Sequence, residues 1–313
     1  MSFVTDHVRV AVPATSGNLG PGFDALGMAH GIWDEVEARA VTGATHVVVE
    51  GEGAGTLPTG EDHLVVRAAR LALAYLDAPQ VGLELHCRNA ITHGRGLGSS
   101  AAAAVAGILV VRGLLGGAGG ARDVLTDAEV LALAVELEGH PDNAAPAIHG
   151  GAVVSWVDDD GAHAAPLTLD PTLRPTLLVP RTVLPTTQAR AALPRDVPHA
   201  DAAFTAARAA LLVVALAGRP DLLLAATQER LHQDYRAPAM PESAALLARL
   251  RGAGHPAVIS GAGPGLLVFG PLPTDLRMDL GAQGWRAYDA GVAGPARIVP
   301  DAGSEEWRIE TGR

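Results

Sequence analysis

The sequence feature that most restricts the fold is a glycine-rich loop running directly into an alanine-rich stretch, Gly94 to Ala104 (GRGLGSSAAAA). The amides at the start of a helix lack intrahelical partners and carry partial positive charge, so this end attracts anions. Glycines let the backbone approach a phosphate closely, and a serine hydroxyl can cap the helix or hold a phosphate-bridging magnesium ion. Alone, the stretch fits a serine-capped helix equally well, so other segments must decide.

Composition predicts a large hydrophobic core without a membrane segment. The chain has 313 residues, 48% of them hydrophobic, and its mean hydropathy is +0.22, which suits one large domain or two intimate lobes. The longest apolar run, Ala209 to Ala217, is too short to span a bilayer, and the first residues do not resemble a signal peptide. A single cysteine, Cys87, fits a reducing compartment, so we expect a cytoplasmic protein.

Charge excludes several functions. The net charge of -11 argues against nucleic-acid binding, so no nucleic-acid partner is expected. The sequence contains no lysine. It therefore cannot use the lysine of a P-loop, the strand lysine of protein kinases or a Schiff base, and a phosphate-binding loop here must work through its backbone.

The periodicity of apolar residues predicts interleaved strands and helices. Alternation predicts strands at 7–13, 32–41, 45–50, 81–88, 151–157, 257–260 and 266–269. Helical spacing predicts helices at 62–76 with Asp62 as the cap, at 99–115, from Thr126 or Asp127 to 138, and within 201–250, whereas 180–198 is expected to be a loop. Without a regular βαβ rhythm, the pattern favours an α+β fold. We place a boundary near 156–172, giving lobes at 1–160 and 161–313.

Two further segments concentrate polar groups between glycines and prolines. Residues 13–27 (PATSGNLGPGFDALG) form an irregular loop with Asn18 and Asp24 available to a ligand, or a self-capping turn. Residues 136–143 (ELEGHPDN) bring carboxylates, an imidazole and an Asp-Asn pair to a helix end. The second segment suits magnesium and polar-substrate chemistry, or merely a capped helix end.

Taken in order, these segments resemble the motifs of the GHMP small-molecule kinases. The resemblance rests on the three motifs above together with 260–265 (SGAGPG), and it covers residues 13 to 269. The first motif, 184–194 (LPTTQARAALP) and 231–238 (LHQDYRAP) are similar to the homoserine kinase branch. Two positions depart from it: Thr92 replaces a frequent proline and His63 a frequent asparagine. The resemblance implies two α+β lobes with the active site between them.

The resemblance also implies where ATP and Mg²⁺ bind. The residues it assigns to ATP are Gly94, Arg95, Gly96, Leu97, Gly98, Ser99, Ser100, Ala101 and Gly263. Magnesium is assigned to Ser100 and Glu136, and Glu136 is preferred to its neighbour Glu138 because it matches the family's first glutamate.

The implied acceptor, L-homoserine, carries an ammonium, a carboxylate and a hydroxyl. The matching substrate positions are Asn18, Asp24, His140, Asn143, Thr186, Arg190 and Arg236. Asp24 suits the ammonium, and the two arginines suit the carboxylate because a guanidinium fork matches it. The catalytic positions are Asn18, Asp142 and Arg190. Asp142 aligns with an aspartate base of some relatives, although positioning without a base is preferred.

The implied activity is phosphorylation of L-homoserine by ATP, giving O-phospho-L-homoserine for threonine biosynthesis, by a homodimer. A GHMP kinase acting on another small alcohol is a second possibility. A ligand-binding regulator descended from a kinase is a third, but it predicts damage at Asn18, Ser100 or Glu136, and all three are intact.

Overall fold

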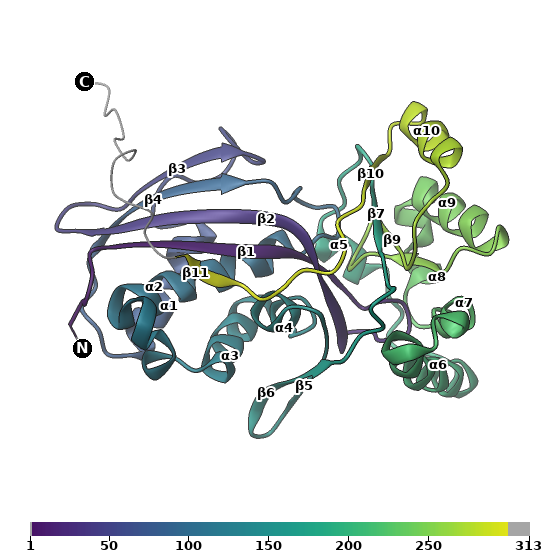
Figure 1. Cartoon of the computed structure of the whole chain (residues 1–313), viewed down its shortest axis with the longest axis horizontal. Coiled ribbons are helices and arrows are strands. Elements are labelled where there is room, and N and C mark those ends of the chain that lie inside the picture. The colour runs from purple at the N-terminus through teal and green to yellow at the C-terminus, as the bar shows by residue number, and fades with distance from the viewer. Residues whose placement is uncertain (1, 300–313) are drawn as a thin grey trace.

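The computed structural model describes residues 2–299, and for residues 118–121 only the backbone. Strands in this range form a seven-stranded and a four-stranded sheet (Figure 1). The first contains β1 (His7–Gly17), β2 (Leu26–Val41), β3 (His46–Gly51), β4 (Gly82–Asn89), β5 (Ala152–Asp158), β6 (Gly161–Leu167) and β11 (Arg297–Val299). The second contains β7 (Thr176–Val179), β8 (Ala257–Ile259), β9 (Leu266–Val268) and β10 (Arg286–Tyr288). Among these strands only β3 and β4 pair in parallel, which confirms the α+β prediction.

Four helices cover one face of the first sheet (Figure 1). They are α1 (Leu64–Tyr75), α2 (Ser99–Val124), α3 (Asp127–Glu138) and α4 (Ala144–His149). Gly107 of α2 lies against the carbonyl of Val65 in α1, where a Cβ would collide with the backbone. The helix predicted at 99–115 ends where expected, because Gly117 has a non-helical φ of 63° and ψ of -178°; a kink there joins it to the second helical stretch of α2. The Thr126 cap is confirmed, and it forms a reciprocal capping box with Glu129.

The remaining helices surround the second sheet. They are α5 (Thr186–Ala191), α6 (His199–Gly218), α7 (Leu223–Ala226), α8 (Gln233–Arg236), α9 (Pro241–Gly252) and α10 (Thr274–Ala282). Two predictions need correction. The stretch expected to be a loop contains α5, a helix too short for periodicity to reveal. The cap of α1 is His63 rather than Asp62, and its side chain makes no capping bond.

The two sheets share much of their core. Sheet membership changes between β6 and β7, and β11 returns to pair with β1. Leu177 and Leu267 of the second sheet pack in the same buried cluster as Val10 of the first. The division at residue 160 stays a prediction.

Two helical segments are long and apolar enough to cross a membrane by length and composition, Ser99–Gly117 and His199–Gly218. The first is 78% buried within the fold, as expected of a core helix, and the second is 22% buried. The expectation that the chain works without a membrane therefore stays a prediction.

Candidate active site

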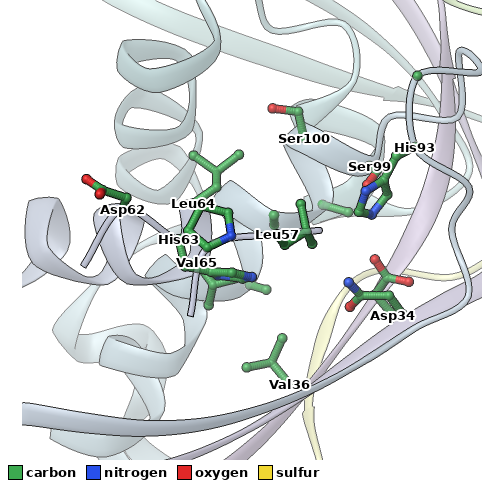
Figure 2. A pocket seen from close by; sticks show the side chains of 16 residues that line it. Asp34, Val36, Leu57, Asp62, His63, Leu64, Val65, His93, Ser99 and Ser100 are labelled. Carbon is green, nitrogen blue, oxygen red and sulfur yellow. The ribbon is translucent and has the colours of Figure 1, made fainter. Parts of the chain in front are cut away.

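Two cavities meet at the start of α2. Gly94, Ser99 and Ser100 line both of them. One, of about 310 Å³, we call the apolar cavity; it is lined mainly by Val36, Leu57, Pro58, His63, Val65, His93, Ala102, Ala103 and Ala106 (Figure 2). The other, of about 330 Å³, we call the polar cavity; it is lined by Asn18, Gly96, Leu97, Gly98, Glu138, His140, Asp142, Asn143, Thr186, Arg190, Arg236, Gly261 and Ala262 among others.

The backbone of the glycine loop is held from behind. Its four successive carbonyls, from residue 94 to residue 97, each accept a hydrogen bond from a neighbouring segment. In chain order the donors are Leu184 N (2.9 Å), Gly265 N (3.2 Å), Ser260 Oγ (2.5 Å) and Thr15 N (3.0 Å). Since the C=O and N–H of a planar trans peptide point in opposite directions, the amides of residues 95–98 point the other way.

Those four amides are available to a ligand, because they donate to no oxygen of residues 2–299. Gly94, Gly96 and Gly98 have φ values of 63°, 74° and 66°. Residues with side chains rarely adopt this conformation, and here it alternates with the ordinary one to form a concave row of N–H groups that suits an anion. The loop and the start of α2 can therefore bind phosphate through the backbone alone.

Among the residues predicted to bind ATP, Arg95 presents only its backbone amide, and Gly263 lines neither cavity. The side chain of Arg95 turns away from both cavities and donates to the carbonyls of His93, Pro180 and Arg181. Gly263 does not line the polar cavity; a Cβ there would meet the sulfur of Met240. Gly261 and Ala262 line the cavity in its place. Arg95 thus anchors the loop, and Gly263 permits close packing behind it.

Glu138, not Glu136, accompanies Ser100. The Ser100 hydroxyl donates to Glu138 Oε1 at 2.5 Å, and burial raises the pKa of that carboxyl. Glu136 is exposed and does not line the polar cavity. Residues two apart on a helix project to nearly opposite sides, which is why the neighbouring glutamates separate. The structure therefore places Glu138 rather than Glu136 beside the loop, and which of them binds magnesium stays a prediction.

A hydroxyl and a carboxylate beside a phosphate-binding loop suit Mg²⁺, which takes few protein ligands and completes its shell with phosphate and water oxygens. The described residues contain no cluster of three or more His, Cys, Asp or Glu side chains that could hold a metal alone. The pair of Ser100 and Glu138 fits a metal that arrives with nucleotide.

Asp142 is buried and fully engaged. Its Oδ1 accepts from His140 Nδ1 at 2.6 Å and from Asn143 Nδ2 at 3.3 Å, and its Oδ2 accepts from the amide of Asn18 at 3.1 Å. A Cβ on Gly17 would collide with the same carboxylate. Hydrogen bonding to Asp142 raises the pKa of His140. The carboxylate therefore joins segment 13–27 to segment 136–143 rather than standing free.

The amide side chains of Asn18 and Asn143 are also engaged. Asn18 has a left-handed φ of 68°, donates through Nδ2 to Gly261 O at 2.9 Å and accepts from the amide of Asp24 at 3.0 Å. Asn143 Oδ1 accepts from the Thr15 hydroxyl at 3.0 Å. Both therefore fix the shape of the polar cavity while lining it.

Asp24 and Arg190 pair with each other. The guanidinium of Arg190 donates two hydrogen bonds to the Asp24 carboxylate, at 2.8 and 3.2 Å. This pairing raises the pKa of Arg190. Arg190 lines the polar cavity, whereas Asp24 lies behind it. Asp24 was expected to stand free for an ammonium group; here its two oxygens face the guanidinium.

Arg236 differs from the other arginines of the site. Its side chain is 1% exposed, and within residues 2–299 no carboxylate lies within 4 Å of it. It donates to Ala189 O at 3.2 Å, to Gly261 O at 3.3 Å and to His232 Nδ1 at 3.3 Å. Burial lowers its pKa, an effect that the carboxylates of Asp24, Glu229 and Asp142 partly oppose. A buried cation without an anionic partner, lining a cavity, is expected to bind an anion there.

The apolar cavity disfavours charge on its buried titratable groups. His63 is 4% exposed, neither ring nitrogen has a partner among the described residues, and burial lowers its pKa. Burial likewise lowers the pKa of His93 and raises that of Asp34 to about 6. Figure 2 shows the imidazole of His63 directed toward Leu57, with Asp62 turned away. Such a cavity suits a flat heteroaromatic group with a few hydrogen-bonding atoms.

Comparison with known proteins identifies the class first. Residues 63–151 match the family described as GHMP kinases N terminal domain. The structure superposes on a homoserine kinase from Cytophaga hutchinsonii with a TM-score of 0.82 at 24% identity, covering 96% of this chain and 99% of that one. It superposes on the L. major mevalonate kinase with a TM-score of 0.62 at 16% identity, covering 90% and 93%. The fold is that of a GHMP kinase.

The particular family follows from sequence relatives. A homoserine kinase of Streptomyces coelicolor is 51% identical over 292 residues, which cover 93% of this chain and 94% of that protein. A homoserine kinase of Clavibacter michiganensis is 52% identical over 270 residues, covering 85% and 84%. The chain belongs to the homoserine kinase family, as the motifs predicted.

Some site residues escaped the sequence analysis. Glu138 was seen but not chosen, and the orientation of α3 is what favours it. Thr92 lines the polar cavity with a buried hydroxyl that has no partner among the described residues. Asp34 and most of the apolar cavity come from β2, the 52–65 segment and α2, where the side chains read as ordinary strand, loop and helix residues.

Proposed function

We propose that this chain transfers the γ-phosphate of ATP to the hydroxyl of L-homoserine, giving O-phospho-L-homoserine and ADP. The observation that carries the proposal is the buried, unpaired guanidinium of Arg236 in the polar cavity, which is a receptor for a carboxylate, beside a loop whose free amides suit phosphate. An amino-acid acceptor satisfies that charge. A neutral alcohol such as a sugar leaves it unpaired.

ATP would bind with its base in the apolar cavity and its phosphates on the loop. The shared lining by Gly94, Ser99 and Ser100 supports this path from one cavity to the other. Magnesium would bind Ser100 and Glu138 together with phosphate oxygens. When bound, it supplies the charge neutralisation that phosphoryl transfer requires.

Homoserine would lie in the polar cavity. Arg236 and Arg190 would hold the carboxylate, Asp24 the ammonium after Arg190 turns toward substrate, and Thr186, Asn18, His140 and Asn143 would line the rest of its path. The homoserine oxygen bonds to the γ-phosphorus, and the bond from that phosphorus to the β,γ-bridging oxygen breaks. ADP leaves, and the hydroxyl proton passes to phosphate or water.

Positioning and electrostatics, rather than a base, would account for the rate. Three donors already bind Asp142 and fix the orientation of its carboxylate within the protein, which favours a positioning role. Asp142 then acts by fixing His140 and the amide of Asn18. We further propose that the protein works as a homodimer in the cytoplasm, for threonine biosynthesis, without membrane or nucleic-acid partners.

The test is ADP release by the purified protein with magnesium, ATP and one acceptor at a time, namely homoserine, mevalonate, galactose or shikimate. Turnover with homoserine alone is the expected result. Turnover on another alcohol would keep the class and change the substrate. Binding of ATP without turnover on any acceptor would favour a regulator.

A further inference from the structure

Behind the glycine loop lies a chain of three buried polar side chains that touch neither cavity. His30 and Ser260 are both 0% exposed, and Ser16 between them is equally buried. His30 Nε2 lies 2.8 Å from Ser16 Oγ, Ser16 Oγ lies 2.7 Å from Ser260 Oγ, and Ser260 Oγ donates to the carbonyl of Gly96 at 2.5 Å. We propose that His30, Ser16 and Ser260 are positioning residues that orient the loop peptide receiving the ATP phosphates.

The direction of every hydrogen bond in this chain follows from counting protons. The Gly96 carbonyl only accepts, so it takes the hydrogen of Ser260. Ser260 must then accept from the hydroxyl of Ser16, and Ser16 must accept from His30 Nε2–H. A neutral imidazole protonated at Nε2 meets this requirement, and burial lowers the pKa of His30 to about 4, which keeps the ring neutral. All three donors therefore point toward the loop.

The far end of the chain contacts the backbone. His30 Nδ1 lies 3.3 Å from the carbonyl of Gly291, an oxygen that can only accept. Donation from His30 to Ser16 uses the Nε2–H tautomer, in which Nδ1 has no hydrogen for Gly291, so the two contacts of the ring compete for one proton. The bond that acts on the loop, from Ser260 to Gly96, is the same in either tautomer.

The chain acts on one peptide group. Fixing the Gly96 carbonyl also fixes the N–H of Leu97, which points the opposite way and belongs to the row of free amides facing the polar cavity. Gly96 itself has a φ of 74°, a region in which glycine has little intrinsic preference for one peptide orientation. Without Ser260 the buried carbonyl loses its partner, and rotation of this peptide would turn the Leu97 amide away from phosphate.

This inference rests on the proposed nucleotide site, and its test separates the two. We would titrate ADP and adenosine into wild type and Ser260→Ala, with no acceptor present. Wild type is expected to bind ADP; if it does not, the proposed nucleotide site fails before the variant is considered. In Ser260→Ala the Kd for ADP should rise about tenfold, while that for adenosine stays within twofold. Equal losses for both ligands would overturn the positioning role.

Thr176→Val is the matched control, because Thr176 is also a buried hydroxyl residue that donates to a backbone carbonyl, that of Gly270 at 2.9 Å, and within residues 2–299 no backbone hydrogen bond joins Gly270 to the glycine loop. It should leave the ratio of ADP to adenosine affinity unchanged, even if thermal stability falls in both variants. A changed ratio in the control would assign the effect to general destabilisation and overturn the proposal.

The order of the chain gives a second test. Ser16→Ala should weaken ADP binding less than Ser260→Ala, since Ser260 can still donate to Gly96. Added to Ser260→Ala, it should produce no further loss, because Ser16 acts only through Ser260. Independent losses that multiply would show that no such chain operates, and so would unchanged ADP affinity in both single variants.

Discussion

The two cavities at the start of α2 share a wall and differ in every other respect. The apolar cavity holds two histidines whose pKa values are lowered and an aspartate whose pKa is raised, all by burial. The polar cavity holds ion pairs, an engaged carboxylate and the buried cation Arg236. The apolar cavity disfavours the charged forms of its buried side chains. The polar cavity contains charged side chains that a ligand can contact. The sharpest experiments are therefore those that disturb one cavity and read out both ligands.

The largest effect is expected at Arg236. Arg236→Met removes the cation but keeps apolar volume, so kcat/KM for homoserine should fall about 10³-fold while the Kd for ATP changes little. Stability should change little, because removing a costly buried charge offsets the loss of its hydrogen bonds to Ala189 O and Gly261 O. Arg230→Met, at an exposed arginine paired with Asp201, is the control and should change neither ligand. An equal loss of ATP affinity in Arg236→Met would contradict the division between cavities.

Asp34 tests whether the apolar cavity disfavours charge. Its folded pKa of about 6 exceeds its ordinary 3.8, so its favourable contribution is complete below pH 3.8 and is lost as the pH rises through about 6. Asp34→Asn should therefore exceed wild type in unfolding free energy by about 3 kcal/mol at pH 7.5 and by little at pH 4. Urea unfolding across this range measures it. Asp62→Asn, at an exposed carboxylate of the same cavity, should show no such gain.

Glu138 lines the polar cavity and accepts a hydrogen bond from Ser100, which lines both cavities. Glu138→Gln should raise the magnesium concentration needed for half-maximal rate and lower kcat by about 10²-fold, because a metal ligand is lost. Glu136→Gln should leave both values within about twofold, since its side chain points outward. Magnesium titrations of the two variants distinguish the two glutamates. A larger effect in Glu136→Gln than in Glu138→Gln would identify Glu136 as the magnesium ligand.

Asp142 separates positioning from base catalysis. Asp142→Asn should lower kcat about tenfold and unfolding free energy by about 1–3 kcal/mol, because an amide cannot accept from all three donors. A base would cost more, up to about 10⁴-fold. Steady-state rates alongside urea unfolding distinguish these outcomes, and a fall of several orders of magnitude with unchanged stability would identify a base.

The smallest effect is expected at His63. His63→Leu removes its ring nitrogens and should raise the Kd for ATP about fivefold, as for loss of one neutral hydrogen bond, with the KM for homoserine unchanged. His63→Asn keeps a donor and an acceptor and should restore most of the affinity. If the His63→Leu variant binds ATP as tightly as wild type, the adenine base does not contact this side chain.

Sequence could predict the parts of the site that depend on the local backbone. The loop glycines and the Thr126 cap follow from residue type and spacing, because positive φ and capping are local requirements. Glu136 and Glu138 show the limit. Both belong to one motif, and only the packing of α3 against the rest of the fold decides which one faces Ser100.

Pairings between distant segments could not be predicted. Nothing local links Asp24 with Arg190, which lie 166 positions apart in sequence, or Ser16 with Ser260, which lie 244 apart. Likewise, nothing local shows that the Arg95 guanidinium donates to the carbonyls of residues 180 and 181, which leaves only its backbone amide for phosphate. Such choices are made by tertiary packing, to which composition and periodicity are insensitive.

The pairing of β11 with β1 has a consequence for biosynthesis. During translation β1 emerges early, pairs with β2 and keeps its other edge open until Arg297–Val299 arrive. Almost the entire chain is synthesised before this edge of β1 is paired, and unpaired strand edges can associate with other chains. A nascent polypeptide stalled before β11 would thus be a preferred client for chaperones, although most of its catalytic groups would already have been made.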